Sequence, residues 1–140
     1  MKDRFFLDTS LFVYSFDHSA PAKAKRARDL IADAVTSRKG IVSYQVVQEF
    51  LNVALKRFER PMKPPEAEQY LTTVFRPLLS VYASQGLFLE ALRLCGRYRF
   101  GWYDSLIVAA ALEGQCSVVY SQDLQHGLRI GDLVVTNPFL

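Results

Sequence analysis

One stretch of the chain decides the fold, and it reads WYDSLIVAAALEGQCSVVYSQDLQ from residue 102 to residue 125. Asp104 precedes an apolar run from Leu106 to Leu112. A helix that is apolar on nearly every side must be buried. The β-branched residues 118–119 then predict a strand, and a second acid, Asp123, follows it. The stretch therefore predicts a buried helix and a strand, each with an acid at one end.

In an open parallel sheet, functional groups collect at the carboxyl ends of the strands and the amino ends of the helices. Asp104 and Asp123 are both expected at that edge, and a buried helix would hold Asp104 rigidly. Each acid taken alone also fits a purely structural role. Asp104 could be an N-cap and Asp123 a turn residue. The functional interpretation therefore depends on which other groups reach the same edge.

The composition predicts a soluble, folded protein. The chain has 140 residues, of which 50% are hydrophobic and 13% aromatic, so we expect a single domain over residues 1–140 with a substantial core. No apolar run is long enough for a membrane span or a secretory signal. Cys95 and Cys116 form no Cys-x-x-Cys pair, which fits a reducing cytoplasm. The net charge of +3 is only mildly cationic.

The rest of the chain alternates between strand-like and helix-like segments, which predicts a three-layer α/β fold with a central parallel sheet flanked by helices. Helical spacing, with Gly40 as a stop signal, predicts a helix from Pro21 to Ser37. Ser43 is expected to cap the next helix, and Pro77 to break a later one. The expected strands are 4–7, 41–43, 78–82, 118–119 and 133–136; the other expected helices begin near residues 44, 65, 86 and 104.

Two further acids are expected at the same sheet edge. Asp8 directly follows the first strand, although it too could serve only as a helix cap. Glu49 lies between apolar neighbours on the third helix, where an unpaired carboxylate is costly and needs a salt bridge or a metal-rich site. Four carboxylates in one place repel each other strongly unless cations hold them. If four of the 14 acids share a site, ten acids remain against 17 basic residues elsewhere, and a basic rim of this kind would suit a polyanion.

Residues 96–102 alternate basic and aromatic side chains between two glycines, which predicts a loop. Guanidinium groups beside stacking rings suit a single-stranded RNA groove. Arg97, Arg99 and Trp102 are therefore candidate RNA contacts, although the aromatic residues could equally close the edge of the core.

Four segments of the sequence resemble the acidic motifs of PIN-domain ribonucleases, and more narrowly the VapC toxins of bacterial toxin-antitoxin pairs. The segments are DTSLFVY from Asp8, QEFL around Glu49, YDSLIVAA around Asp104 and SQDLQHG around Asp123. The closing Asn137-Pro138-Phe139 is also similar to the end of many such proteins. The resemblance covers the whole chain, and four motifs in this order and spacing are more specific than any one of them.

The resemblance implies a Mg²⁺- or Mn²⁺-dependent endoribonuclease, the toxin of a type II pair, which forms a homodimer and is inhibited by a VapB-like antitoxin. It implies that Asp8, Glu49, Asp104 and Asp123 are catalytic and that Asp8, Asp104 and Asp123 bind the metal, with Ser10 and Ser121 as supporting residues. Hard divalent cations prefer oxygen ligands. Two departures are Ser10, where relatives often have Asn, and Gln122, where many have Glu; the latter leaves open whether one ion or two would bind.

Alternatives from other classes remain. A dehalogenase-type phosphatase needs Asp-x-Asp after the first strand, and position 10 is Ser. No nucleotide-binding glycine motif is present. The sequence has only two histidines, His18 and His126, which disfavours a metal-free ribonuclease with a paired acid and base. The main rival is a catalytically inactive PIN-like module that binds RNA or protein.

Overall fold

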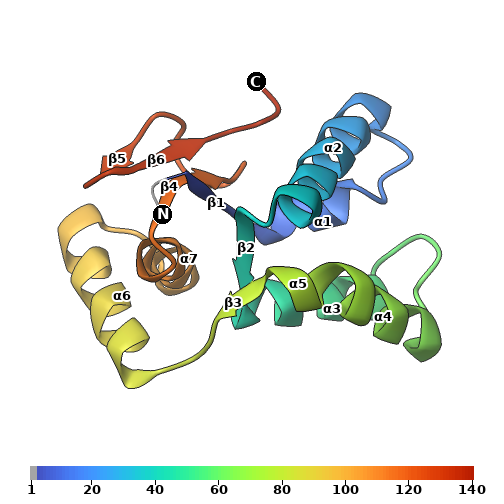
Figure 1. The fold of residues 1–140 in the computed structure, drawn as a ribbon, viewed down its shortest axis with the longest axis horizontal. Helices are drawn as coiled ribbons and strands as arrows, with labels where there is room; N and C mark the ends of the chain where they lie inside the picture. The colour runs from blue at the N-terminus through green and yellow to red at the C-terminus, as the bar shows by residue number, and fades with distance from the viewer. Residues whose placement is uncertain (1–2) are drawn as a thin grey trace.

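A six-stranded, mostly parallel sheet forms the centre of the molecule, as the computed structural model of residues 3–140 shows (Figure 1). The strands are β1 (Arg4–Leu7), β2 (Gly40–Ser43), β3 (Leu79–Val81), β4 (Cys116–Tyr120), β5 (Arg129–Ile130) and β6 (Leu133–Thr136). Their order across the sheet is β3-β2-β1-β4-β6-β5. All neighbouring pairs are parallel except β5 and β6. The expected α/β class is confirmed, although the antiparallel strand β5 was not predicted.

Helices cover both faces of this sheet. The helical segments are α1 (Thr9–Tyr14), α2 (Pro21–Ser37), α3 (Tyr44–Lys56), α4 (Pro64–Tyr70), η1 (Leu71–Phe75), α5 (Arg76–Leu78), α6 (Gln85–Tyr98) and α7 (Trp102–Glu113). In Figure 1, α6 and α7 lie on one side of the central strands and α1 to α5 on the other. Over residues 3–140, no helix combines the length and the apolar character needed to cross a membrane.

Hydrogen bonds between neighbouring strand ends align the carboxyl edge. The Asp8 N–H donates to the Tyr120 carbonyl at 3.0 Å, and the Ser121 N–H donates to the Thr136 carbonyl at 3.0 Å. These bonds tie the ends of β1, β4 and β6 together. The residues that directly follow β1 and β4 therefore lie next to each other at the carboxyl edge of the sheet, as the alternation of strands and helices predicted.

Gly40 does not end α2, although the sequence pattern predicted that it would. Helix α2 ends at Ser37, and Arg38 is its C-cap in the left-handed conformation, with φ 62°. Gly40 instead begins β2, where a Cβ atom would collide with Ala34 of α2. Close approach of the helix to the strand, rather than a turn, requires glycine there.

Pro77 also fails to break its helix. It lies at the first turn of α5, directly after the π-helical segment η1, in which the Arg76 N–H bonds the Leu71 carbonyl five residues back. Proline has no N–H to donate to the carbonyl four residues before it, and a widened turn accommodates this loss. The strand that follows is shorter than expected. Similarly, α6 continues to Tyr98, so the predicted loop 96–102 is reduced to three residues, 99–101.

Candidate active site

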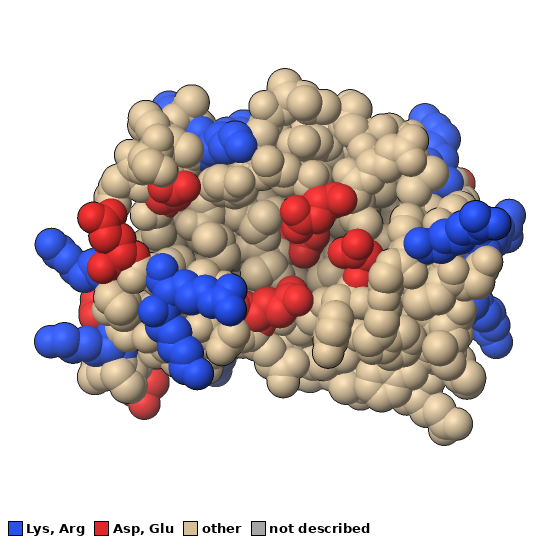
Figure 2. Space-filling view, turned by 180° about the vertical axis from the view of Figure 1, so that it is seen from behind, with Lys and Arg blue, Asp and Glu red and all other residues tan. Residues whose placement is uncertain are grey.

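The four acids predicted at the sheet edge line one cavity of about 570 Å³. Asp8 follows β1, Glu49 lies on α3, Asp104 is in the first turn of α7, and Asp123 follows β4. Figure 2 shows carboxylate side chains gathered at a hollow in the middle of one face, with most lysine and arginine side chains farther out. The fold thus brings together acids from four separate parts of the sequence.

Asp8 is almost fully buried, with 5% of its surface exposed. It is the N-cap of α1, and its Oδ1 atom accepts a hydrogen bond from the Thr9 N–H at 2.7 Å. Its Oδ2 atom accepts one from the Ser121 hydroxyl at 2.8 Å. Burial nevertheless raises the pKa of Asp8 to about 7, because desolvation outweighs these hydrogen bonds and the negative charges of Asp123 and Glu49 add to it. Asp8 is therefore a helix cap and an electrostatically strained carboxyl at once.

Ser121 connects Asp8 to the loop that carries Asp123. Besides donating to Asp8, its fully buried hydroxyl accepts hydrogen bonds from the backbone N–H groups of Asp123 at 3.1 Å and Leu124 at 3.3 Å. Ser121 thus lies where a supporting residue was expected. Ser10 also lines the cavity, but its buried hydroxyl has no hydrogen-bond partner among the described residues.

Glu49 is held by two residues that the sequence did not single out. The Thr9 hydroxyl donates to Glu49 Oε1 at 2.6 Å, and the Gln45 amide donates to Glu49 Oε2 at 3.4 Å. The same Gln45 amide donates to the Tyr103 carbonyl at 3.2 Å, which links α3 to α7. The spacing of Gln45 and Glu49, one helical turn apart, could have indicated this contact. The salt bridge considered for Glu49 is not found in the described part of the chain.

Asp104 is not the N-cap of α7, because Gly101 occupies that position and the helix begins at Trp102. Asp104 lies in the first helical turn, where the helix dipole favours a negative charge. Its pKa is nonetheless raised, first by burial and then by the negative charges of Asp123 and Glu49. The carboxylates therefore act on one another electrostatically across the cavity.

No basic side chain neutralises this cluster within residues 3–140. The ion pairs found there join Lys25 to Asp29, Lys39 to Asp3, and Arg93 to Glu90, all away from the cavity. Carboxylate oxygens are the donors that Mg²⁺ and Mn²⁺ prefer, and Mg²⁺ is commonly held by one or two carboxylates plus waters and phosphate. The donor set fits such an ion, although no three acids, histidines or cysteines of the described residues are close enough together to hold one as they lie.

The three predicted RNA contacts lie outside the cavity wall. Arg97 and Arg99 are exposed at the end of α6, where Arg99 is the left-handed C-cap with φ 59°. Trp102 packs on Phe88 of α6, with ring centroids 6.2 Å apart. The cavity is lined instead by Tyr103, which is 66% exposed, and by Tyr14. The sequence reasoning missed these two tyrosines.

Comparisons with known proteins identify the family and the fold of the chain. The PIN domain family matches residues 5–128. A solved toxin-antitoxin complex from Klebsiella pneumoniae contains a chain that is 16% identical, with a TM-score of 0.65 and coverage of 95% of this chain and 96% of that one. A structure of FitAB bound to an IR36 DNA fragment contains a chain that is also 16% identical, with a TM-score of 0.72 and coverage of 97% and 96%. No curated protein sequence matches the chain. At this identity the structural likeness concerns the fold.

Proposed function

The chain belongs to the PIN domain family, and from this premise we propose that it is a metal-dependent endoribonuclease whose residues 1–140 act as one catalytic domain. The observation that carries the proposal is the cavity itself, which is lined by four carboxylates that have no basic partner among residues 3–140. Such an arrangement costs stability unless a cation binds. A cation held there would in turn attract a phosphodiester.

We assign metal binding to Asp8, Asp104 and Asp123. A bound Mg²⁺ or Mn²⁺ would supply Lewis-acid chemistry, in that it lowers the pKa of a water and neutralises charge on the phosphate. Asp8 is fixed by Ser121 and by the start of α1, and Asp104 is fixed by the buried helix α7. Rigid carboxylates of this kind hold an ion in one place.

Glu49 is proposed as the proton acceptor. The Thr9 hydroxyl occupies Oε1 at 2.6 Å, whereas the contact of Gln45 with Oε2 is long at 3.4 Å, which leaves Oε2 able to take a proton from water. The water oxygen then attacks phosphorus, the bond from phosphorus to the 3′-oxygen breaks, and this oxygen takes a proton from solvent. The products carry a 5′-phosphate and a 3′-hydroxyl.

The proposal is tested by incubating the purified protein with labelled single-stranded RNA in Mn²⁺, with EDTA as control, and by repeating the assay with Asp104→Asn. We expect internal cleavage by the wild type, its loss in EDTA, and a loss of roughly 100-fold or more in the variant. Circular dichroism checks that the variant is folded. Wild-type rates in Asp104→Asn, or cleavage that persists in EDTA, would reject the assignment.

The alternative is a catalytically inactive module that binds RNA or protein. A cluster of four acids disfavours it, because uncompensated negative charge repels a phosphate chain. RNA binding that needs no metal, with no cleavage in Mn²⁺, would support this alternative.

We further propose that the protein is the toxin of a type II toxin-antitoxin pair, acting as a cytoplasmic homodimer inhibited by a VapB-like antitoxin. The similar folds in a toxin-antitoxin complex and in FitAB support this role. Phe88, Leu89 and Leu92 of α6 are exposed and provide an apolar surface on which a second copy could pack. Growth arrest on expression, relieved by co-expression of a short open reading frame found next to the gene, tests the toxin role; light scattering tests the dimer.

A further inference from the structure

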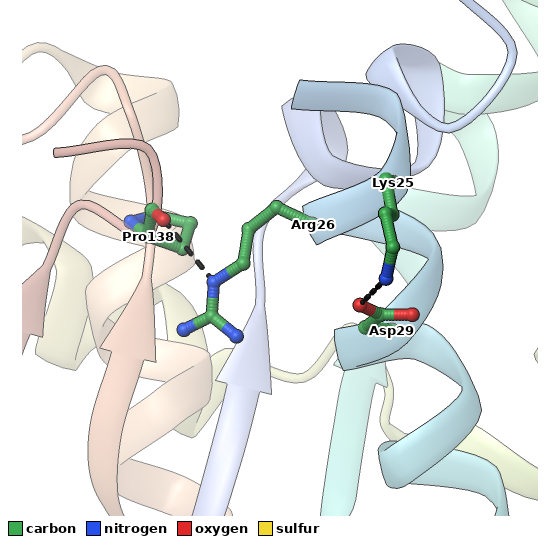
Figure 3. A network of polar contacts seen from close by, with 4 residues as sticks. All are labelled: Lys25, Arg26, Asp29 and Pro138. Atoms are coloured by element: carbon green, nitrogen blue, oxygen red, sulfur yellow. Dashed lines mark hydrogen bonds and ion pairs between the residues drawn. The ribbon is translucent and has the colours of Figure 1, made fainter. Parts of the chain in front are cut away.

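Helix α2 directs two basic side chains toward the C-terminal segment. Lys23 and Arg26 are three residues apart and so share one side of the helix. Arg26 Nε donates a hydrogen bond to the Pro138 carbonyl at 3.2 Å (Figure 3). In the same view Lys25 turns to the other side of the helix and pairs with Asp29 at 2.9 Å. Lys25 is thus paired with a carboxylate, whereas Lys23 and Arg26 form no ion pair with the described residues.

The C-terminal segment facing these two cations is held in place by its own hydrogen bonds. The Asn137 N–H donates to His126 Nδ1 at 3.0 Å, and the Phe139 N–H donates to Asn137 Oδ1 at 2.9 Å. This turn packs the Phe139 ring edge-on against Tyr14, with ring centroids 5.2 Å apart. The segment therefore connects α2 to a wall of the acidic cavity, because Tyr14 lines that cavity.

Lys23 lies over this aromatic pair. Its Nζ atom is 4.8 Å from the Tyr14 ring centroid and 5.6 Å from that of Phe139. Within the described residues it makes no ion pair. The charge of Lys23 lowers the pKa of Asp17 less than the hydrogen bonds that the Asp17 carboxylate accepts from Ser19. A positioned ammonium without a carboxylate, beside a ring on the wall of a nucleic-acid cavity, has the chemistry of a phosphate contact.

We propose that Lys23, with Arg26 beside it, binds a backbone phosphate of the RNA strand close to the one that is cut, while the strand passes over Tyr14. This inference rests on the proposed nuclease function. Asp8 and Tyr14 lie at opposite ends of α1, whose six residues span about 9 Å. Nucleotides advance by roughly 3.4 Å or more each, so a strand centred on the acids reaches Tyr14 within about three nucleotides.

The test compares Lys23→Gln with Lys25→Gln, each in an Asp104→Asn background that prevents cleavage. Both variants remove one positive charge from α2, but only the first removes a charge at the proposed subsite. Binding of a fluorescent single-stranded RNA 20-mer is followed by anisotropy over a range of KCl concentrations. We expect roughly three- to tenfold weaker binding for Lys23→Gln and a salt slope smaller by about 0.7, with Lys23→Arg retaining affinity.

Equal affinities for the Lys23→Gln and Lys25→Gln proteins would overturn the subsite, because the contact would then be general attraction only. Wild-type cleavage of the same RNA in Mn²⁺ is measured in parallel. Cleavage by the wild type without any selective effect of Lys23→Gln rejects the subsite and leaves the nuclease intact. A selective effect of Lys23→Gln without wild-type cleavage supports the subsite and rejects the nuclease.

Discussion

Helices α1 and α3 each have two faces with opposite physical character. One face of each helix enters an aromatic cluster, which consists of Phe12, Phe16, Phe50, Phe58, Tyr70 and Phe75, with ring centroids 4.8 to 6.4 Å apart in the contacting pairs. The other face lines the acidic cavity with residues that include Thr9, Gln45 and Glu49. The aromatic face contributes burial, whereas the acidic face gathers like charges, which oppose folding.

The comparison indicates that the aromatic cluster offsets the electrostatic cost of the cavity. Phe50 and Glu49 are adjacent on α3, yet Phe50 is fully buried and Glu49 faces the cavity. Rigid packing on one side also fixes the positions of the acids on the other. Changes in the cluster should therefore alter stability, and changes in the cavity should alter chemistry.

The largest expected effect is on stability, from Phe50→Ala. Phe50 packs against five other rings, so its truncation leaves a cavity that neighbouring side chains fill poorly. We expect a loss of about 3–5 kcal/mol in the free energy of unfolding, measured by urea denaturation. Tyr82→Ala, at a residue 60% exposed, is the control and should cost less than about 0.5 kcal/mol. Similar losses of unfolding free energy in both proteins would show that the aromatic cluster does not stabilise the fold more than an exposed ring does.

The second prediction is that Asp8→Asn changes stability and activity in opposite directions. The pKa of Asp8 in the folded protein, about 7, lies above its ordinary value of 3.8, so the folded protein binds more protons than the unfolded chain between these two pH values. Stability should consequently fall as pH rises from about 4 to about 7. Asp8→Asn should remove this part of the pH dependence and be the more stable protein above pH 7, while cleavage falls roughly 100-fold or more.

Urea denaturation at pH 5 and pH 8 measures the difference in stability between the wild type and the Asp8→Asn protein. Repeating the measurement with Mn²⁺ tests whether Asp8 binds the ion. The ion should stabilise the wild type at pH 8 and have little effect on the Asp8→Asn protein. A variant less stable than the wild type at both pH values would show that the two hydrogen bonds to Asp8 outweigh its burial.

The two faces also differ in how far the sequence predicts them. Apolar residues at helical spacing indicate burial directly, so the range of α2 and the buried nature of α7 followed from the pattern. The turn at Leu71–Phe75 did not, because the combination of Pro77 with tertiary packing produces a π-helix there. Strand β5 was not predicted for a related reason. Two residues are too few to show the alternation of apolar and polar side chains that indicates a strand, and β5 is recognised only by its pairing with β6.

In the cavity, Asp8, Asp104 and Asp123 could be placed because each follows a strand or lies at the start of a helix, and Glu49 because its helix leaves the same edge of the sheet. Apart from Gln45, which lies one helical turn before Glu49, the hydrogen-bond partners of these acids could not be derived from spacing along the chain. Ser121 and Asp8 are 113 positions apart, and Thr9 and Glu49 are 40 apart, so these contacts exist only after the sheet has formed. The prediction of a loop over residues 96–102 depends on the two glycines of that segment, but α6 continues through Gly96 to Tyr98, so the loop is shorter.

The third prediction concerns Gln45, which is 4% exposed and joins the two sides of the cavity. Gln45→Leu keeps approximate size but removes the hydrogen bonds to Glu49 and to the Tyr103 carbonyl. An unpaired carbonyl and a loosened carboxylate should cost about 1–2 kcal/mol of stability. The turnover number should also fall with KM little changed. Gln45→Glu, which keeps the shape and adds a charge, should lower stability further; no effect of either change would exclude a positioning role.

The smallest effect is expected at Thr9, whose hydroxyl donates to Glu49 Oε1. Thr9→Val has nearly the same shape and leaves the backbone cap at Asp8 intact, so only this one hydrogen bond is removed. Glu49 is half-buried and can recover a partner from water, which limits the loss of stability to about 1 kcal/mol. Turnover should nonetheless fall several-fold, because a solvent molecule on Oε1 does not fix the carboxylate as Thr9 does, so Oε2 is no longer held toward the water that it deprotonates. Thr9→Ser restores the hydroxyl and should restore turnover. If the valine and serine proteins cleave equally well, the chemistry of the acidic face does not depend on the hydrogen bond from Thr9 to Glu49.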